Sequence, residues 1–207
     1  MKLVPVLFIA SLASAAPPGL FFPFKLPCSS ISGTPCICPP NTQYNESTTM
    51  SYVGATASDV ESIVNDYFNV GWAGFDLVMV QGPDNFPGLS IRDLNMNTAV
   101  GTYTFSERLI LRFVNPDGSF EQRSEQREII PYRSGNGTFS GHWVTLKGDR
   151  IFENETLVRV TRYFCQTGHP IDFAGFDQLA LSNVTNILAA AGKINGISSD
   201  PASAQRF

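Results

Sequence analysis

The stretch from Asp172 to Ile194, DFAGFDQLALSNVTNILAAAGKI, decides the fold that this sequence predicts. At about 100° per residue its apolar positions fall on one stripe, which is typical of a helix that covers a core. Asp172 is a suitable N-cap, and Gly192 stands where glycine often ends a helix. The pattern predicts a helix of about five to six turns. Its apolar stripe consists of Phe173, Phe176, Ala180, Val184, Ile187 and Ala191.

A strand with one buried face is predicted between Gly101 and Val114. Odd and even positions alternate there, and the even positions are polar or charged apart from one isoleucine. This period of two is the period of a β-strand. The odd positions are Tyr103, Phe105, Glu107, Leu109, Leu111 and Phe113.

The other elements complete an α+β fold. A capping box from Ser58 to Glu61 begins an amphipathic helix predicted over residues 58–69. Further strands are predicted over residues 43–53, 119–130, 138–147 and 156–166, separated by turn sequences. We therefore expect a curved antiparallel sheet wrapped around the long C-terminal helix, formed by residues 43–195. Residues 196–207 are expected to be a flexible tail.

The N-terminal residues predict export. Lys2, the apolar run from Leu3 to Leu12 and the small residues at 13–15 form a secretory signal over residues 1–15. This run is shorter than the roughly 20 residues that span a bilayer, and no later stretch is long and apolar enough. Residues 16–42 are a Pro- and Cys-rich extension. Its phenylalanines are expected to pack on the body of the protein or, alternatively, to dock a partner.

The four cysteines are expected to pair, because disulfides form in the oxidising secretory route. Cys36 and Cys38 are too close in sequence to pair comfortably with each other. We expect one bridge from Cys28 to Cys36 or Cys38, and a second from the remaining cysteine to Cys165. With two histidines in the chain and an oxidising compartment, no metal site and no cofactor are predicted.

Sequons and net charge agree with a secreted protein. Glycosylation is predicted at Asn45, Asn136 and Asn154, whereas Asn183 lies on the long helix and is a poor acceptor. The net charge of −4 argues against nucleic-acid binding. A dense charged strand is expected to present a solvated face with cross-strand pairs, and edge protection is its simplest role. Its charged residues are Glu121, Arg123, Glu125, Arg127 and Glu128.

Several short motifs carry a resemblance to a known family. The stretch from Ala57 to Phe68, followed by Trp72, is similar to the first helix and tryptophan of the START-like superfamily. Val100 to Phe105 and Glu107 to Leu109 are similar to its glycine-centred strand and following Glu-x-Leu strand. The chain thus resembles the helix-grip proteins of that superfamily, which include pollen-allergen-like and polyketide-cyclase-like proteins, over about residues 43–194.

The resemblance implies a cavity for an apolar small molecule, such as a lipid, sterol or phenolic compound, between the sheet and the final helix. It implies no fixed catalytic set, because different sites are built on one fold. The alternative is that the same side chains fill a solid core. The residues expected to line the cavity are Tyr103, Phe105, Glu107, Leu109, Leu111, Phe113, Trp143, Phe173, Phe176, Val184 and Ile187.

Three functions remain open from the sequence. The first is a secreted binder of an apolar molecule, the second an enzyme on the same fold, and the third an interaction protein with a filled core. Glu107 is the one charged residue among the odd positions of the predicted strand 101–114, which are otherwise apolar. It is either buried or turned to solvent by a bulge or tight turn near Ser106. If Trp143 faces inward, His142 faces out. A buried Glu107 within reach of His142 or Tyr103 would favour the enzyme, and the sequence indicates no oligomeric state.

Overall fold

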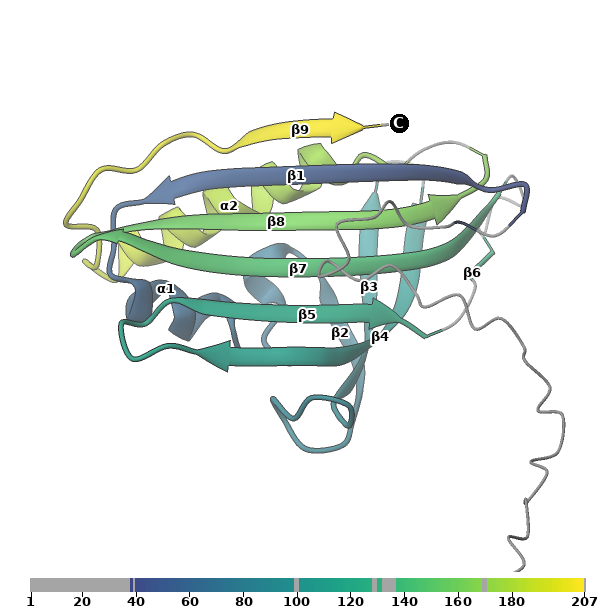
Figure 1. The fold of residues 1–207 in the computed structure, drawn as a ribbon, viewed down its shortest axis with the longest axis horizontal. Helices are drawn as coiled ribbons and strands as arrows, with labels where there is room; N and C mark the ends of the chain where they lie inside the picture. Colours follow the sequence, from purple (N-terminus) through teal and green to yellow (C-terminus); the bar gives the residue numbers. More distant parts are fainter. Residues whose placement is uncertain are drawn as a thin grey trace, which may run out of the picture.

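One antiparallel sheet organises the protein. A computed structural model describes residues 38, 40–98, 101–127, 130–131, 137–168 and 171–206. Within these residues, nine strands form the sheet in the order β2-β3-β4-β5-β7-β8-β1-β9, with β6 paired to β7 (Figure 1). Their bounds are β1 Gln43–Val53, β2 Asp76–Gln81, β3 Ile91–Thr98, β4 Gly101–Val114, β5 Phe120–Gln126, β6 Ile130–Pro131, β7 Thr138–Phe152, β8 Glu155–Gln166 and β9 Ala202–Arg206.

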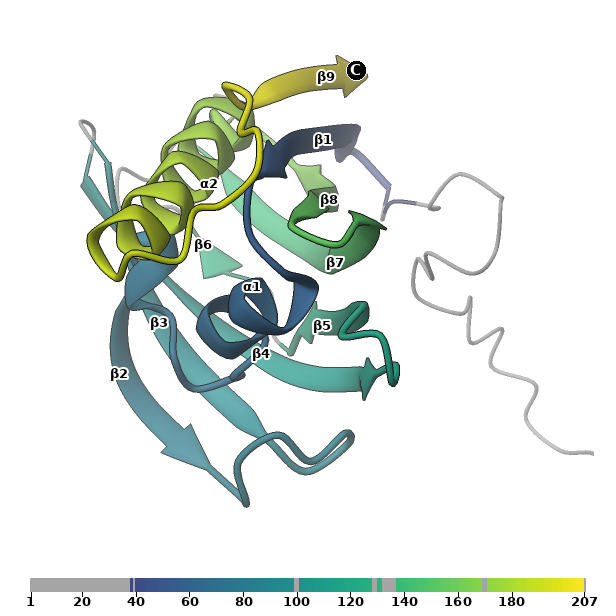
Figure 2. The same ribbon diagram turned by 90° about the vertical axis from the view of Figure 1, so that its left-hand side faces the viewer.

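The predicted C-terminal helix is confirmed as α2 (Phe173–Ala190), which lies on the concave side of the sheet (Figure 2). Asp172 caps it, since its side chain accepts from the Gly175 amide at 2.9 Å. Gly192, at φ 68°, ends it in a left-handed conformation. The buried stripe is rotated by about one position from the predicted one, because Asp177 faces inward and Ile187 is 37% exposed. The buried residues of α2 are Phe173, Ala174, Asp177, Ala180, Leu181, Val184 and Leu188.

The first helix is shorter than predicted. It forms α1 (Ala57–Val64), and its N-cap is Thr56, whose hydroxyl accepts from the Asp59 amide at 3.1 Å. The chain leaves the helix at Asn65, and the amide of Tyr67 donates instead to Asn85 Oδ1 at 2.8 Å. A short 3₁₀ helix, η1 (Gly71–Ala73), follows and packs against α2.

Strands β1 and β4 have the bounds that the sequence predicts, and β7 continues past the predicted end. Two expectations are wrong: the edge role of the charged strand and the flexible tail over residues 196–207. Strand β5 lies between β4 and β7, so its charged residues are on the outer face of the sheet and not at an edge. Residues 202–206 of the expected flexible tail form β9, which pairs with β1 and is fixed by a 2.7 Å hydrogen bond between the hydroxyls of Thr49 and Ser203.

The concave face holds two packed groups of apolar side chains. The larger joins α1 and α2 to β1, β5, β7 and β8, and it includes Val60, Phe120, Val160 and Leu188. The smaller brings Phe105 of β4 and Phe164 of β8 onto Phe173 of α2. The packing between strands is close: a methyl group on Gly148 would lie 2.2 Å from the ring of Phe120.

One disulfide of the described residues ties the extension to the sheet. Cys38 is bonded to Cys165 with their Cα atoms 5.4 Å apart, which agrees with one of the expected pairings. Cys28 and Cys36 lie outside the described residues, so their pairing stays a prediction. Within the described part of the chain, no helix has the length and apolar character needed to cross a membrane.

The sequons differ in how exposed the structure leaves them. Asn45 faces the concave side and is 1% exposed, so the prediction of a glycan there is wrong, because a folded strand leaves no room for one. Asn183 donates from Nδ2 to the carbonyl of Trp72 at 2.9 Å, which agrees with its exclusion. Asn154 lies half-buried in the turn between β7 and β8 and stays a prediction. Asn136 lies outside the described residues.

Candidate functional site

A buried carboxylate, Glu107 of β4, stands at the centre of the candidate site. It is 3% exposed, so the alternative that a bulge turns it to solvent is wrong. Arg92 of the neighbouring strand β3 donates to Glu107 Oε2 from Nη2 at 2.8 Å and from Nε at 3.1 Å. Ser124 Oγ lies 3.4 Å from the same oxygen. The guanidinium of Arg92 also stacks over the ring of Tyr67 and donates to its carbonyl at 2.6 Å.

His142 links this pair to a second one. Its Nδ1 lies 3.3 Å from Glu107 Oε1, and its Nε2 lies 3.1 Å from Nη1 of Arg162. A guanidinium donates and cannot accept, so Nε2 must be the unprotonated nitrogen of the ring. The proton therefore belongs on Nδ1, where it is directed at Glu107. Stacking on Phe173, with ring centroids 5.2 Å apart, fixes the plane of the imidazole.

Arg162 of β8 completes the chain of charges by pairing with Asp177 of α2. Its Nη2 donates to Asp177 Oδ1 at 2.7 Å and its Nε to Oδ2 at 2.8 Å, a bidentate arrangement. The two side chains are 5% and 1% exposed, respectively. Phe173 lies 5.0 Å below the guanidinium. This pair explains why Asp177 lies on the buried face of α2.

Burial and neighbouring charges set the protonation states of Glu107, His142 and Arg162. Burial alone would raise the pKa of Glu107, but Arg92 and the His142 hydrogen bond hold that pKa well below its ordinary value. Burial lowers the pKa of His142, which is only partly opposed by Glu107 and is reinforced by Arg162. The pKa of Arg162 is raised, since the attraction of Asp177 outweighs burial. At neutral pH Glu107 is therefore a carboxylate, Arg162 a cation and His142 neutral.

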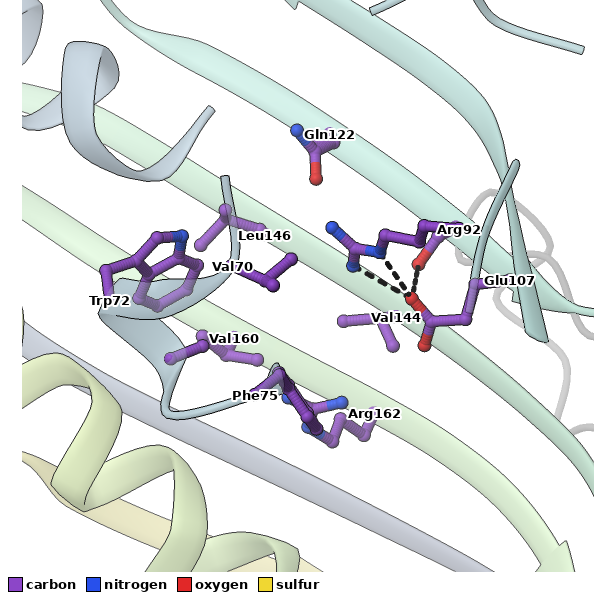
Figure 3. A pocket seen from close by; sticks show the side chains of 12 residues that line it. Val70, Trp72, Phe75, Arg92, Glu107, Gln122, Val144, Leu146, Val160 and Arg162 are labelled. Carbon is purple, nitrogen blue, oxygen red and sulfur yellow. Dashed lines mark hydrogen bonds and ion pairs between the residues drawn. The ribbon is translucent and has the colours of Figure 1, made fainter. Parts of the chain in front are cut away.

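The two guanidiniums and Glu107 reach a small cavity between the sheet and the segment 70–75. The cavity has a volume of about 30 Å³, with apolar walls and a polar end at Arg92 and Glu107 (Figure 3). This space exceeds the roughly 10–15 Å³ that one water requires. It is lined by Val70, Trp72, Ala73, Phe75, Arg92, Glu107, Gln122, Ser124, Val144, Leu146, Val160 and Arg162.

Of the residues predicted to line a cavity, Glu107 is the one that borders this space. Phe105, Leu109, Phe173 and Val184 are buried on the concave side as core. Tyr103 and Phe176 pack at the margin of the smaller apolar group. Ile187 is 37% exposed and faces away from the core, because the buried stripe of α2 is rotated.

A bulge reverses the predicted alternation at the end of β4. The register with β5 shifts between Leu109 and Leu111, so the residues beyond it change face. Phe113 is therefore 39% exposed, and the prediction that it faces the cavity is wrong. Arg112 now points to the concave side, where its Nε donates to the carbonyl of Asn65 at 2.7 Å. Leu111 is half-buried beyond the same bulge.

The prediction that Trp143 lines the cavity is also wrong, and with it the condition under which His142 would face out. His142 is 2% exposed on the concave side, whereas Trp143 pairs across the outer face with Glu125 and Tyr163. The indole lies against Gly141, where a methyl group would come within 2.4 Å of the ring. Strand alternation then places the imidazole on the other face.

The sequence analysis missed the partners of Glu107. Arg162 stands on the same parity of its strand as Val158, Val160 and Phe164, so a charge among apolar positions was the available signal. Asp177 stands on the buried side of α2 in the same way. Arg92 lies on β3, a strand that was not predicted. Among the described residues, no three His, Cys, Asp or Glu side chains converge as a metal site would require.

Comparison with known proteins defines the family. A family model described as a START domain matches residues 44–204. Because the match covers most of the chain, this protein belongs to the START-domain family, and the resemblance inferred from the sequence is confirmed. A comparison with curated protein sequences finds no match.

Solved structures with this fold are distant in sequence. A norcoclaurine synthase point mutant from Thalictrum flavum is 11% identical, with a TM-score of 0.51, over 74% of this chain and 99% of that chain. Ara h 8.0201 is 8% identical, with a TM-score of 0.48, over 72% and 99%. A START superfamily protein from Mycobacterium smegmatis is 13% identical, with a TM-score of 0.44, over 72% and 97%. At these identities the likeness concerns the fold alone.

Proposed function

We propose that this protein binds an apolar small molecule that carries one polar, hydrogen-bond-accepting group. The ligand would occupy the space between the concave face of the sheet and the segment 70–75, widened from the present cavity. The observation that carries this proposal is that two guanidiniums, the half-buried Arg92 and the buried Arg162, border a cavity whose walls are largely apolar. Membership of the START-domain family supports it.

The guanidiniums retain donors for such a ligand. Each guanidinium has five N–H groups. Contacts among the described residues account for three on Arg92, through Glu107 and the Tyr67 carbonyl. They likewise account for three on Arg162, through Asp177 and His142. A ligand oxygen at the polar end of the cavity would accept from the remaining groups, while Val144 and Val160 contact its apolar part.

Binding requires the segment 70–75 to move outward. The cavity of about 30 Å³ is about a tenth of the smallest pockets that hold drug-sized ligands, which begin at about 300 Å³. The contacts that hold this segment include the hydrogen bond from Asn183 to the carbonyl of Trp72 and the ring of Phe75, 4.7 Å from that of Phe176. The Trp72 ring also packs on the larger apolar group, so opening must expose part of that group.

The contact between Glu107 and His142 meets the geometric criterion for an enzyme, but its electrostatics favour binding. A general base is most effective when its pKa lies near the working pH. The pKa of Glu107 is held far below that range, and its carboxylate is occupied by Arg92. Both ring nitrogens of His142 face charged partners, and the imidazole does not border the cavity. These groups fix the polar end of the cavity.

We propose further that the protein acts outside the cell. The secretory signal in residues 1–15 supports this location, and the Cys38–Cys165 disulfide fits it because such bonds persist in oxidising compartments. Expression in a secreting eukaryotic host, followed by N-terminal sequencing of the medium fraction, tests the location. Retention of the intact N-terminus inside the cell would contradict it.

Ligand binding is tested on the purified, exported protein. Native mass spectrometry with organic extraction would reveal a co-purifying lipophile, and 1-anilinonaphthalene-8-sulfonate serves as an apolar anionic probe. Val144→Met should weaken probe binding at least fivefold, because it fills the cavity. The control Val114→Met, at a 43% exposed position, should leave affinity unchanged. An empty protein that binds no probe, or equal effects of the two variants, would favour an interaction protein with a filled core.

A further inference from the structure

A second hollow lies on the outer face of the sheet, away from the cavity. Figure 1 looks onto this face, with α2 behind the strands. The hollow has a volume of about 200 Å³, more than ten times the roughly 10–15 Å³ needed by one water. Its charged residues are Glu121, Arg123, Lys147 and Arg159, and its hydroxyl groups come from Thr145, Thr161 and Tyr163. We call it the outer groove.

The outer groove is built from two rows of side chains that cross three strands. Glu121, Lys147 and Arg159 are direct neighbours across β5, β7 and β8. Arg123, Thr145 and Thr161 form the next row. The groove is lined by three cations and one carboxylate, and Asp149 beside it pairs with Lys147, so one positive charge remains in excess, although the whole protein has a net charge of −4. A local excess of positive charge on an acidic protein concentrates anions at that place.

Two of the three cations in the outer groove already have a carboxylate partner, and Arg159 is the exception among the described ion pairs. Arg123 pairs with Glu121, and Lys147 Nζ lies 2.9 Å from Asp149. No ion pair within the described residues reaches Arg159, which sits directly opposite Lys147 in the β7–β8 ladder. Like charges directly opposite each other on antiparallel strands destabilise a sheet. An anion bound between Lys147 and Arg159 would convert this repulsion into attraction.

We propose that the outer groove binds an oxyanion, a phosphate or sulfate ester, on a small hydroxylated molecule. The guanidinium of Arg159 and the ammonium of Lys147 receive the anion. The hydroxyls of Thr145, Thr161 and Tyr163 form hydrogen bonds with the hydroxylated part of the ligand. The Tyr163 phenol, whose pKa is raised by burial and by the neighbouring Glu46, is a hydrogen-bond donor at neutral pH. This site is independent of the cavity on the concave face.

Calorimetric titration at low salt tests the groove with three probes: glucose 6-phosphate, inorganic phosphate and glucose. Glucose 6-phosphate should bind saturably, and added salt should weaken it. Arg159→Ala should reduce its affinity at least tenfold, the usual scale for a lost charge-assisted hydrogen bond. Arg150→Ala removes the same charge from an exposed position outside the groove and should change affinity less than twofold. Equal affinity of inorganic phosphate would still support the site and assign it to the anion alone.

The unliganded variants separate a binding site from a structural one. Arg159→Ala should leave the melting temperature unchanged or raise it, because it removes the repulsion from Lys147. A clear loss of thermal stability would show that Arg159 supports the fold and would overturn the proposal. So would the absence of saturable binding of either phosphate compound at 20 mM, equal binding of glucose, or equal losses in Arg159→Ala and Arg150→Ala.

Discussion

Removing one charge of the buried Arg162–Asp177 pair should destabilise the protein severely. In Asp177→Leu, the guanidinium stays within the core and loses both bidentate hydrogen bonds. Breaking a buried ion pair on one side costs about 3–5 kcal/mol of unfolding free energy, because the remaining charge has no partner. With a urea m-value of about 2 kcal/mol/M, the unfolding midpoint should fall by about 2 M.

The double variant Arg162→Met/Asp177→Leu should be much less destabilised than the two single changes suggest. Removing both charges leaves one identified deficit, Nε2 of His142 without its donor, which costs about 1–3 kcal/mol. Two single losses of at least about 3 kcal/mol and a double loss of at most about 3 give a coupling energy of at least about 3 kcal/mol.

Urea denaturation at pH 7 with the disulfide intact measures all three variants. Asp200→Leu, at an exposed position, is the matched control and should change the midpoint little. A loss below 1 kcal/mol in Asp177→Leu would refute the reasoning, since it would mean that water reaches the guanidinium. Additive losses in the double variant would refute it equally.

Three further perturbations follow from the same structure. Burial lowers the pKa of His142 below its ordinary 6.5, so the unfolded chain binds a proton that the folded chain does not. Unfolding free energy should therefore fall as the pH drops below about 6.5, and His142→Gln should flatten that slope in urea titrations. Cys38→Ser/Cys165→Ser removes a disulfide between residues 127 positions apart and should lower the unfolding free energy by about 2–4 kcal/mol relative to the oxidised protein. Gly148→Ala should cost about 1–3 kcal/mol by overpacking a core ring, whereas Gly71→Ala, with open space around it, should shift the melting temperature little.

The helices and strands could be predicted from the sequence because capping residues and apolar periodicity are local patterns. The cap at Asp172 and the 3.6-residue period that follows are properties of consecutive residues, so they predict α2 without knowledge of its neighbours. The alternation after Gly101 predicts β4 in the same way. Strands β3 and β9 were missed. The alternation in β3 is short, with Leu94 and Met96 buried among polar residues, and β9 has none, so both depend on pairing with β4 and β1.

The site could be predicted from the sequence only in part, because the face of the sheet on which a side chain lies depends on the neighbouring strands. A bulge opposite β5 changed the face of Phe113, and packing on Gly141 placed Trp143 outside, which turned His142 inward. The sequence marked Glu107 as a charge on an apolar face but could not say which cations neutralise it. Arg92 and Arg162 come from strands that are separate in the chain and adjacent in space.

By itself, then, the sequence determined the α+β class, the long helix and most strands, since period and capping act over a few residues. The START-like family was inferred from the resemblance of short motifs and confirmed by the family model. The tertiary structure alone decided the chain of charges from Arg92 to Asp177, the small volume of the cavity and the outer groove. Each of these depends on side chains brought together by sheet register and helix packing. Distances between residues far apart in sequence are fixed by the folded chain and by no local pattern.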